Sequence, residues 1–465
     1  MGRGPICVAS AGLAAVLGCH QSGGATDGAP ADAVADSGSG ATTDVPAPCD
    51  FSVGKNELSA KIPTVGVVEW SLAGGQPASA RIVYQLANAD SSLLNHGGTA
   101  PVDLTRPNHR TLLLGLKQGK DYTFHIEAVR DGQACVSPDF TLPTTGKLTI
   151  SPSVTVQVTQ AGKRRPGFIV TSSGQFVPNS AFIIDADGEI VWSFAGPEST
   201  TRALMDYEGQ NMWMLALNLL NEGGEMRYVS MDGLEERDDV PGMAYAHHDF
   251  TVMPGGKVAA LAWASPGNDP ASEVLIRSPD GTTTSPFLVG QNVFGADGYY
   301  HANAIHYLES DDSFTIADRD MNALVKVGAT GRPDWQIGGT CVGASTGDRC
   351  LPQTWQVNHG HHFLDDGTLL LFNNGDSGVN HILQFAVDGA GGAFTATLVQ
   401  NYAGDGTGNT MGDVQRLPGG NTLVTYSLDG RIVELDPSWN KVQTFSVRVG
   451  YSSWRPTLYG PPARL

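Results

Sequence analysis

Histidines in the second half of the chain recur at a fixed distance from tight turns. His248 and His359 each stand eight residues before a glycine that marks a hairpin turn, Gly256 and Gly367 respectively. Equal offsets in repeated hairpins predict that both imidazoles lie at the same height of the structure. An imidazole can act as a nucleophile, a general acid or a general base. The spacing therefore predicts two chemically competent histidines at one end of a repeated fold.

His301 and Arg319 extend this pattern. His301 begins the strand between those hairpins and precedes the turn residue Asp312 by eleven residues, because that segment is longer. Arg319 follows Asp312 by seven residues, and the second strand of a hairpin returns to the end where the first began. We therefore expect Arg319 beside His301. Arginine donates hydrogen bonds through a planar fork, so the three histidines and the arginine predict a pocket for a small oxyanion.

Repeated hairpins must position these residues. Each opens with a strand, turns on Gly or Asp and returns as an apolar strand, at residues 167–177, 203–215, 247–261, 304–319, 361–372 and 413–426. The turn markers Gly256, Asp312, Gly367 and Gly420 lie 56, 55 and 53 residues apart. A second hairpin follows each one, and two hairpins make a four-stranded sheet. About six such sheets predict an all-β fold, a six-bladed β-propeller over residues 150–465.

A smaller domain is expected before the propeller. Residues 49–147 contain short alternating runs separated by turn residues, which predicts a β-sandwich. The segment Leu114–Tyr122 resembles the corner of a fibronectin type III domain, with Tyr122 as the corner tyrosine and Trp70 as the core tryptophan. We expect no chemistry in this domain.

The N-terminal residues indicate export. Residues 1–18 have one basic residue followed by a short apolar stretch, and Val16–Cys19 resembles the lipobox of bacterial lipoproteins. Cys19 would then carry the lipid, the alternative being an ordinary signal peptide with an incidental cysteine. Residues 19–48 are small and polar, which predicts a disordered tether. His20 in place of Asp implies, by the same resemblance, the outer membrane of a Gram-negative bacterium, on its periplasmic or cell-surface side.

Charge and cysteine content narrow the class of protein. The chain has 28 Lys and Arg against 47 Asp and Glu, a formal net charge of −19, which argues against a nucleic-acid partner. No stretch beyond the N-terminus is long and apolar enough to span a bilayer, so we expect membrane contact only through the lipid. Apart from Cys7 in the export signal and the lipidation candidate Cys19, four cysteines remain, and their positions favour two disulfides, Cys49–Cys135 and Cys341–Cys350. The sequence leaves the oligomeric state open.

Several motifs occur in the order found in the bacterial arylsulfotransferase family. They are His247-His248-Asp249, His301-Ala302-Asn303, Arg319, Trp335–Gly339 and Asn358–Gly375. This chain resembles that family, whose members are periplasmic six-bladed propellers that move a sulfuryl group between phenols without a nucleotide donor. The resemblance implies an aromatic sulfate ester and a phenol as partners, with no cofactor and no metal.

The resemblance also assigns roles to residues. It implies that His359 is the nucleophile and forms a sulfohistidine, and that His301, Arg319 and His248 (or its neighbour His247) hold the sulfuryl oxygens. Further substrate contacts are expected from the polar and aromatic residues near the same mouth, namely Asn303, His247, His361, Tyr299, Tyr300 and Trp355.

Departures from the family pattern leave alternatives open. Asn358 precedes the nucleophile where Gln is usual, and Asn373 replaces an Asp. His361 would lie on the same side of a strand as His359, and could be the reactive residue instead. His359, His361 and His362 could also ligate zinc in a metal-dependent propeller hydrolase. A third alternative is a non-catalytic cell-surface propeller that binds a ligand or a partner.

Overall fold

The computed structural model describes residues 49–463 apart from residues 89, 177, 219–222, 239, 264–271, 295–300, 340, 342–348, 353–354, 376–377 and 390–392. The predicted signal peptide, Cys19 and the tether lie outside the described residues, as do Tyr299 and Tyr300. Among the residues described, the helical elements are three short turns, η1 (Pro107–His109), η2 (Ala161–Lys163) and η3 (Val289–Phe294). Within the described range, none of the helices has the length and apolar character needed to cross a bilayer. The fold is all-β, as predicted.

Two sheets that share one core form the N-terminal part. One sheet has the order β1 (Phe51–Leu58), β2 (Gly66–Leu72), β5 (Thr111–Leu113). The other has the order β4 (Gly97–Pro101), β3 (Ser79–Leu86), β6 (Tyr122–Arg130), β7 (Gln133–Val136), with β8 (Phe140–Thr141) also on β6. Alternate residues of these strands, such as Trp70, Ile82 and Phe124, pack into a single apolar cluster. The fibronectin type III assignment stays a prediction.

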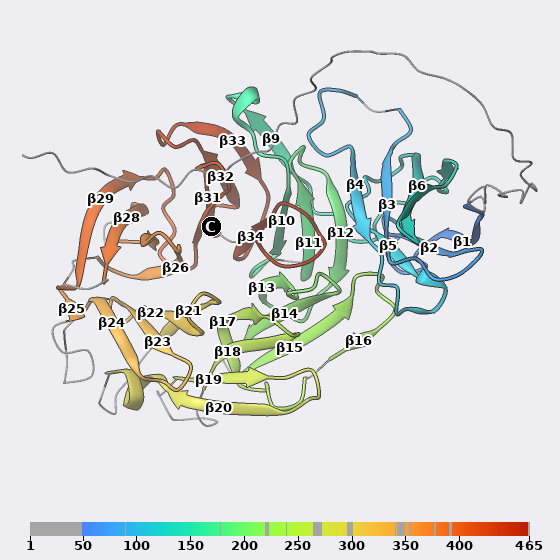
Figure 1. Ribbon diagram of the computed structural model, residues 1–465. Helices are drawn as coiled ribbons and strands as arrows, with labels where there is room; N and C mark the ends of the chain where they lie inside the picture. The colour runs from blue at the N-terminus through green and yellow to red at the C-terminus, as the bar shows by residue number, and fades with distance from the viewer. Residues whose placement is uncertain are drawn as a thin grey trace, which may run out of the picture. The chain divides into compact units, whose positions relative to one another are not determined.

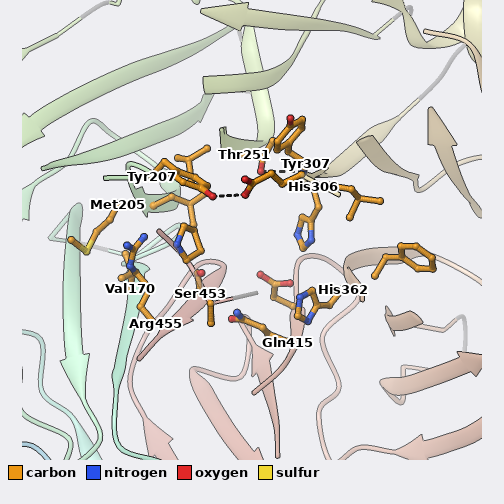
Figure 2. Close-up of a pocket in the computed structure, with 18 of the residues that line it drawn as sticks. Val170, Met205, Tyr207, Thr251, His306, Tyr307, His362, Gln415, Ser453 and Arg455 are labelled. Carbon is orange, nitrogen blue, oxygen red and sulfur yellow. Dashed lines mark hydrogen bonds between the residues drawn. The ribbon is translucent and has the colours of Figure 1, made fainter. Parts of the chain in front are cut away.

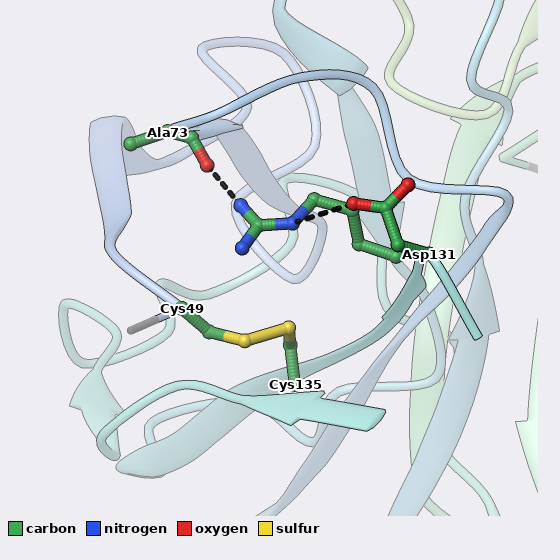
Figure 3. The surroundings of a disulfide bond; sticks show 5 residues. Cys49, Ala73, Asp131 and Cys135 are labelled. Carbon is green, nitrogen blue, oxygen red and sulfur yellow. Dashed lines mark hydrogen bonds and ion pairs between the residues drawn. A yellow bond between two sulfur atoms is a disulfide. The ribbon is translucent and has the colours of Figure 1, made fainter. Parts of the chain in front are cut away.

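Local contacts hold this part together. A disulfide joins Cys49 to Cys135, and beside it Arg130 donates to the Ala73 carbonyl and pairs with Asp131 (Figure 3). The Tyr122 hydroxyl accepts the backbone N–H of Lys117 at 2.9 Å. The second predicted disulfide, Cys341–Cys350, is also present.

The other strands of the described residues form six sheets. The first three are β12 (Ile190–Ala195), β11 (Ser180–Asp185), β10 (Phe168–Ser172) and β34 (Ser452–Arg455); β13 (Thr200–Met205), β14 (Asn211–Asn218), β15 (Gly223–Ser230) and β16 (Glu236–Arg237); and β17 (Ala246–Met253), β18 (Lys257–Trp263), β19 (Ser272–Arg277) and β20 (Thr283–Leu288). The next two are β21 (Ala302–Leu308), β22 (Ser313–Asp318), β23 (Ala323–Gly328), β24 (Pro333–Gly338) and β25 (Cys350–Leu351); and β26 (Asn358–Phe363), β27 (Thr368–Asn373), β28 (His381–Asp388) and β29 (Thr395–Ala403). The last is β30 (Asp413–Arg416), β31 (Thr422–Tyr426), β32 (Arg431–Leu435), β33 (Lys441–Ser446) and β9 (Thr155–Val158).

These sheets are arranged radially about a common centre, which is a propeller-like arrangement (Figure 1). Six strands, called the inner strands below, contact one another in a closed ring, in the order β34, β13, β17, β21, β26 and β30. Apolar side chains fill the space between neighbouring sheets; Leu261 and Val274 of one, for example, share a cluster with Phe314 and Ile316 of the next. Because both faces of a sheet are covered in this way, strands such as β11 and β13 are buried along their whole length.

Strands from the beginning and the end of the segment that forms these six sheets close the ring. The inner strand of the first sheet is β34, which pairs antiparallel with β10, and the outermost strand of the last sheet is β9. The hairpin predicted for residues 167–177 is therefore wrong, because β10 pairs with β11 and with β34, and Gln175 and Phe176 lie in the connection between β10 and β11. The sheet obtains its fourth strand from the distant end of the sequence.

Candidate active site

Inner strands that carry a predicted site residue are irregular at that point. The register of β17 against β18 shifts between Ala246 and Phe250, and the register of β26 against β27 shifts between Asn358 and His361. Within the first irregularity His248 has φ = 56°, a left-handed conformation that is unusual for a residue with a side chain. Bulges of this kind turn a side chain out of the regular alternation. They place His248 and His359 at the start of their strands, directed toward a shared region.

His248 rather than His247 faces this region. The Nε2 atom of His248 lies 2.9 Å from Nε2 of His301, while its Nδ1 lies 2.7 Å from Nδ1 of His247. His247 is fully buried and stacks on Trp263, with ring centroids 3.9 Å apart. The two neighbouring histidines therefore have different contacts. His247 packs within its own sheet, whereas His248 contacts His301.

Arg319 lies beside His301, as the hairpin geometry predicted. The backbone N–H of Arg319 donates to the carbonyl of His301 at 2.9 Å. The Arg319 guanidinium pairs through Nη1 with Asp320 at 2.8 Å, and the same carboxylate lies 3.5 Å from Nδ1 of His301. About a third of each of the Arg319 and Asp320 side chains is exposed, so this edge of the site is open to solvent.

The orientation of His359 is fixed by Asn374, a residue for which the sequence pattern predicts no role. Nδ1 of His359 lies 2.6 Å from Oδ1 of Asn374. The amide nitrogen of Asn374 donates to the carbonyls of Gly408 and Met411, at 2.9 and 3.0 Å, so its oxygen must be the atom that faces the imidazole. An amide oxygen only accepts, and His359 therefore carries its proton on Nδ1. Its Nε2 then holds a free electron pair, the form that a nucleophile needs.

Burial and the charges of neighbouring groups shift the pKa values of His359 and His248. Burial, reinforced by the charges of Arg319 and His301, lowers the pKa of His359 to about 4 against the opposing effect of the Asn374 hydrogen bond. Burial also lowers the pKa of His248, and the charges of His301, His359 and Arg319 lower it further. Both imidazoles are consequently neutral at neutral pH. We call His248, His301, His359 and Arg319 the imidazole cluster.

Other predicted residues lie at or away from this cluster. Asn303 is buried on β21; its amide nitrogen donates to the Asn358 carbonyl at 2.7 Å, while its Oδ1 is buried without a partner among the described residues. Trp355 is buried and donates to Oδ1 of Asn358, so it supports the strand and does not offer a face to an aryl ring. His361 contacts Thr315 at 2.8 Å and stacks on His306.

The expected alternation between His359 and His361 is wrong, because the register shift in β26 lies between Asn358 and His361. As a result His359, His361 and His362 have three separate partners, which are Asn374, Thr315 and the backbone N–H of Arg416. Across the part of the chain that the structure describes, no group of three His, Cys, Asp or Glu side chains is placed to hold a metal ion. The zinc alternative therefore has no ligand set there.

A buried ion layer lies one residue beyond the imidazole cluster. Arg202 of β13 pairs with Asp249 of β17 at 3.1 Å and with Asp413 of β30 at 2.5 Å. Each of these residues stands seven positions before its own turn glycine, and so does Gly360 of β26. A side chain at Gly360 would meet the Asp413 carboxylate, since a Cβ built there lies 2.2 Å from Oδ1. The Asp249 carboxylate also accepts the N–H of Ile305, so the layer joins four inner strands.

A cavity of about 230 Å³ lies on the other side of this ion layer (Figure 2). Its lining residues follow the ion layer along the inner strands and include Thr251, His306, His362, Gln415 and Arg455. The imidazole cluster is not among them. The axial region thus has three levels, the imidazole cluster, the ion layer and the cavity.

The match to known families falls on the segment that carries most of this geometry. Residues 269–389 match the family model described as Arylsulfotransferase (ASST). That range contains His301, Asn303, Arg319, His359 and Asn374, whereas His248 and Arg202 precede it. The arylsulfotransferase match supports the family resemblance and, at the level of the family, a sulfotransferase type of enzyme with aryl sulfates and phenols as substrates. It covers less than half of the chain.

Solved structures with similar folds are distant. One is a protein of unknown function from Bacteroides caccae, with 14% identity and a TM-score of 0.39 over 61% of this chain and 94% of that chain. Another is a catalytically inactive virginiamycin B lyase from Staphylococcus aureus with quinupristin, with 14% identity and a TM-score of 0.37 over 63% of this chain and 88% of that chain. At such identity the similarity concerns the fold alone. No curated protein matches the sequence.

Proposed function

We propose that this chain is an aryl-sulfate sulfotransferase that carries the sulfuryl group on His359, within a six-bladed β-propeller. The arylsulfotransferase match over residues 269–389 supports the reaction class. The observation that carries the proposal is His359 itself: a neutral imidazole, with its proton held on Nδ1 by Asn374, beside an arginine and two further imidazoles. A nucleophile and an oxyanion-binding set in one place suit sulfuryl transfer.

In the first half-reaction, Nε2 of His359 attacks the sulfur of an aryl sulfate ester. The N–S bond forms, the bond between sulfur and the aryl oxygen breaks, and the phenolate leaves with the electron pair of that bond. Arg319, His248 and His301 hold the sulfuryl oxygens, on which negative charge is redistributed in the transition state. Because these groups are already in place, little reorganisation is needed as the charge moves.

In the second half-reaction, the oxygen of an acceptor phenol attacks the sulfur of the sulfohistidine. Its O–H proton is transferred to a base in the cluster, the S–N bond breaks, and His359 regains its electron pair on Nε2. Donor and acceptor use the same site in turn, so the kinetics should be of the ping-pong type.

A covalent intermediate can be tested directly. The full-length protein is mixed with an aryl sulfate without acceptor, quenched at neutral pH and analysed by intact mass and peptide mapping. We expect one added SO₃ group on His359, removed when a phenol is added and insensitive to a chelator. His359→Asn should remain unmodified, and His381→Asn, which changes a histidine with a similar 2.6 Å contact to an asparagine at Asn401, should behave as wild type. A wild-type protein that stays unmodified while releasing phenol would contradict the proposal.

The remaining sequence predictions belong to the same proposal. We propose that residues 1–18 are a lipoprotein signal peptide, that Cys19 carries a lipid on a tether of residues 19–48, and that residues 49–147 form a fibronectin type III-like spacer. The protein would then be anchored in the outer membrane of a Gram-negative bacterium. Metabolic labelling with a fatty acid, compared between wild type and Cys19→Ser, tests the anchor.

A further inference from the structure

Asp320 is a carboxylate at the imidazole cluster that neither the motifs nor the proposed mechanism uses. It directly follows Arg319, in the turn after β22, and contacts two cluster members: Nη1 of Arg319 at 2.8 Å and Nδ1 of His301 at 3.5 Å. The turn is fixed from below by the buried Asp318, whose Oδ1 accepts the N–H groups of Asp320 and Met321. The position of Asp320 is therefore built into the backbone.

This carboxylate determines where the protons of the neighbouring imidazoles lie. A carboxylate only accepts, so the nitrogen of His301 that faces Asp320 carries a proton and Nε2 of the neutral ring is bare. Nε2 of His248, 2.9 Å away, must then be the donor, which leaves its Nδ1 bare. That atom accepts from Nδ1 of His247 at 2.7 Å. One carboxylate thus orients the tautomers of three imidazoles in sequence.

We propose that Asp320 is a positioning residue that makes His301 the acid–base group of the transfer reaction while it anchors Arg319. This inference rests on the proposed function. It concerns how the aryl oxygen gains or loses its proton, a step that is separate from the binding of the sulfuryl oxygens by the cluster. A carboxylate behind an imidazole both orients the ring and favours its protonated form, and here Asp320 opposes the burial that lowers the pKa of His301.

The proton balance closes over the two half-reactions. In the first, a His301 ring that has taken up a proton from solvent on Nε2 gives that proton to the aryl oxygen as the bond between that oxygen and sulfur breaks, and the neutral ring keeps its Nδ1 proton toward Asp320. In the second, the acceptor phenol gives its O–H proton to Nε2 of His301 as its oxygen bonds to sulfur and the S–N bond of His359 breaks. The proton gained in the second step replaces the one given up in the first, so no external acid is consumed.

A general acid speeds the departure of a poor leaving group more than that of a good one, and this difference provides the test. Single-turnover formation of the sulfohistidine is measured for Asp320→Asn and wild type with two donors, 4-nitrophenyl sulfate and phenyl sulfate. Asparagine keeps an oxygen for Arg319 and His301 but removes the charge. With phenyl sulfate, whose phenolate is a poor leaving group, we expect the rate to fall about 30- to 100-fold, and with 4-nitrophenyl sulfate to fall by no more than about 3-fold.

The control is Asp311→Asn. It removes a carboxylate from the same sheet, one that pairs with Lys326 away from the cluster, and should leave both rates unchanged. The midpoint of thermal unfolding is compared for all three proteins. Equal losses with both donors would overturn the acid–base role of Asp320, and unchanged rates would overturn its positioning role altogether. If wild type forms no sulfohistidine with either donor, the proposed function itself fails, which is a different result from a normal wild type with an insensitive Asp320 variant.

Discussion

For each imidazole of the site, the partner of one ring nitrogen determines which of the two nitrogens carries the proton. Asn374 fixes His359 and Asp320 fixes His301, while His248 is held between His301 and His247. These partners decide which nitrogen has a free electron pair and therefore which ring can attack, donate or accept. The chemistry of the site thus depends on residues that need not touch a substrate.

Replacing Asn374 tests this at the proposed nucleophile, His359. In Asn374→Ala the His359 ring loses the acceptor that holds its proton on Nδ1, so the reactive tautomer becomes a fraction of the population and the ring is free to turn. We expect sulfohistidine formation to slow about 10- to 100-fold, with the binding of donor less affected. Asn401→Ala, which removes a contact of the same 2.6 Å length to the exposed ring of His381, is the matched control and should change neither quantity.

The pH dependence of the first half-reaction follows from the burial of His359. Attack needs the neutral ring, and burial lowers the pKa of His359 from its ordinary 6.5 to about 4. With 4-nitrophenyl sulfate, whose leaving group needs no acid, the rate should stay constant from neutral pH down to about pH 5 and fall as the pH drops through about 4. A rapid-quench pH profile measures this. A fall centred near 6.5 would contradict it.

Among single residues, the histidines and the arginine of the site could be predicted from the sequence, whereas the asparagine and the aspartate that orient them could not. His248, His301, His359 and Arg319 stand out by type and by offset from turns, and the structure brings them together. Asn374 and Asp320 lie among many similar turn residues, and their roles depend on which atom faces which ring. The order of residue types along the chain does not show which atom will face which ring.

At the scale of elements, irregular inner strands and the ion layer work together. The shifts in β17 and β26 bring the histidines into position, and one residue further along, Arg202, Asp249 and Asp413 hold the same strands to each other. Burial raises the pKa of Asp249 to about 7 in spite of Arg202, which indicates how strongly this layer is shielded from water.

Removing the arginine should therefore be costly. In Arg202→Met two buried carboxylates lose their cation, and we expect the free energy of unfolding to fall by about 3–5 kcal/mol. Denaturation by urea measures it. Arg227→Met is the control, because Arg227 pairs with carboxylates of Glu225, Glu236 and Asp238 at the edge of the second sheet, where loss of the pairs should cost about 1 kcal/mol or less. Similar losses in the two variants would show that the layer has no special importance.

The hairpins were predictable from the sequence because their turn residues recur at nearly constant intervals, and five of the six first hairpins are present with the strands expected. The ion layer was not predicted, although Arg202, Asp249 and Asp413 share one offset from a turn glycine. The sequence shows that an apolar strand contains one charged residue, but it does not show which charged residue of another strand will pair with it. The exchange of β34 into the first sheet likewise depends on closure of the ring.

At the scale of the whole molecule, a buried lysine links the N-terminal sandwich to the first sheet. Lys117 is fully buried and contacts Asp185, and it also reaches Asp187 at 3.1 Å and Glu189 at 3.6 Å. The hydroxyl groups of Tyr84 and Tyr459 meet at 3.2 Å across the same boundary. The sandwich and the sheets are therefore expected to unfold together.

Lys117→Met should separate them. The variant leaves the Asp185 carboxylate buried without its cation, which should cost about 3–5 kcal/mol and split one calorimetric transition into two. Lys55→Met, which removes exposed contacts to Glu57 and Glu69 within the sandwich, should keep a single transition. A single transition in the Lys117 variant, unchanged in midpoint, would mean that the linkage lies elsewhere.

The position of β34 has a consequence for biosynthesis. Because the first sheet takes its inner strand from Ser452–Arg455, a growing polypeptide cannot complete that sheet until those residues have left the ribosome. Until then β10 presents an open edge to other chains, and a product that stops early never covers it. Only a polypeptide that extends through Ser452–Arg455 is therefore protected from aggregation at this edge.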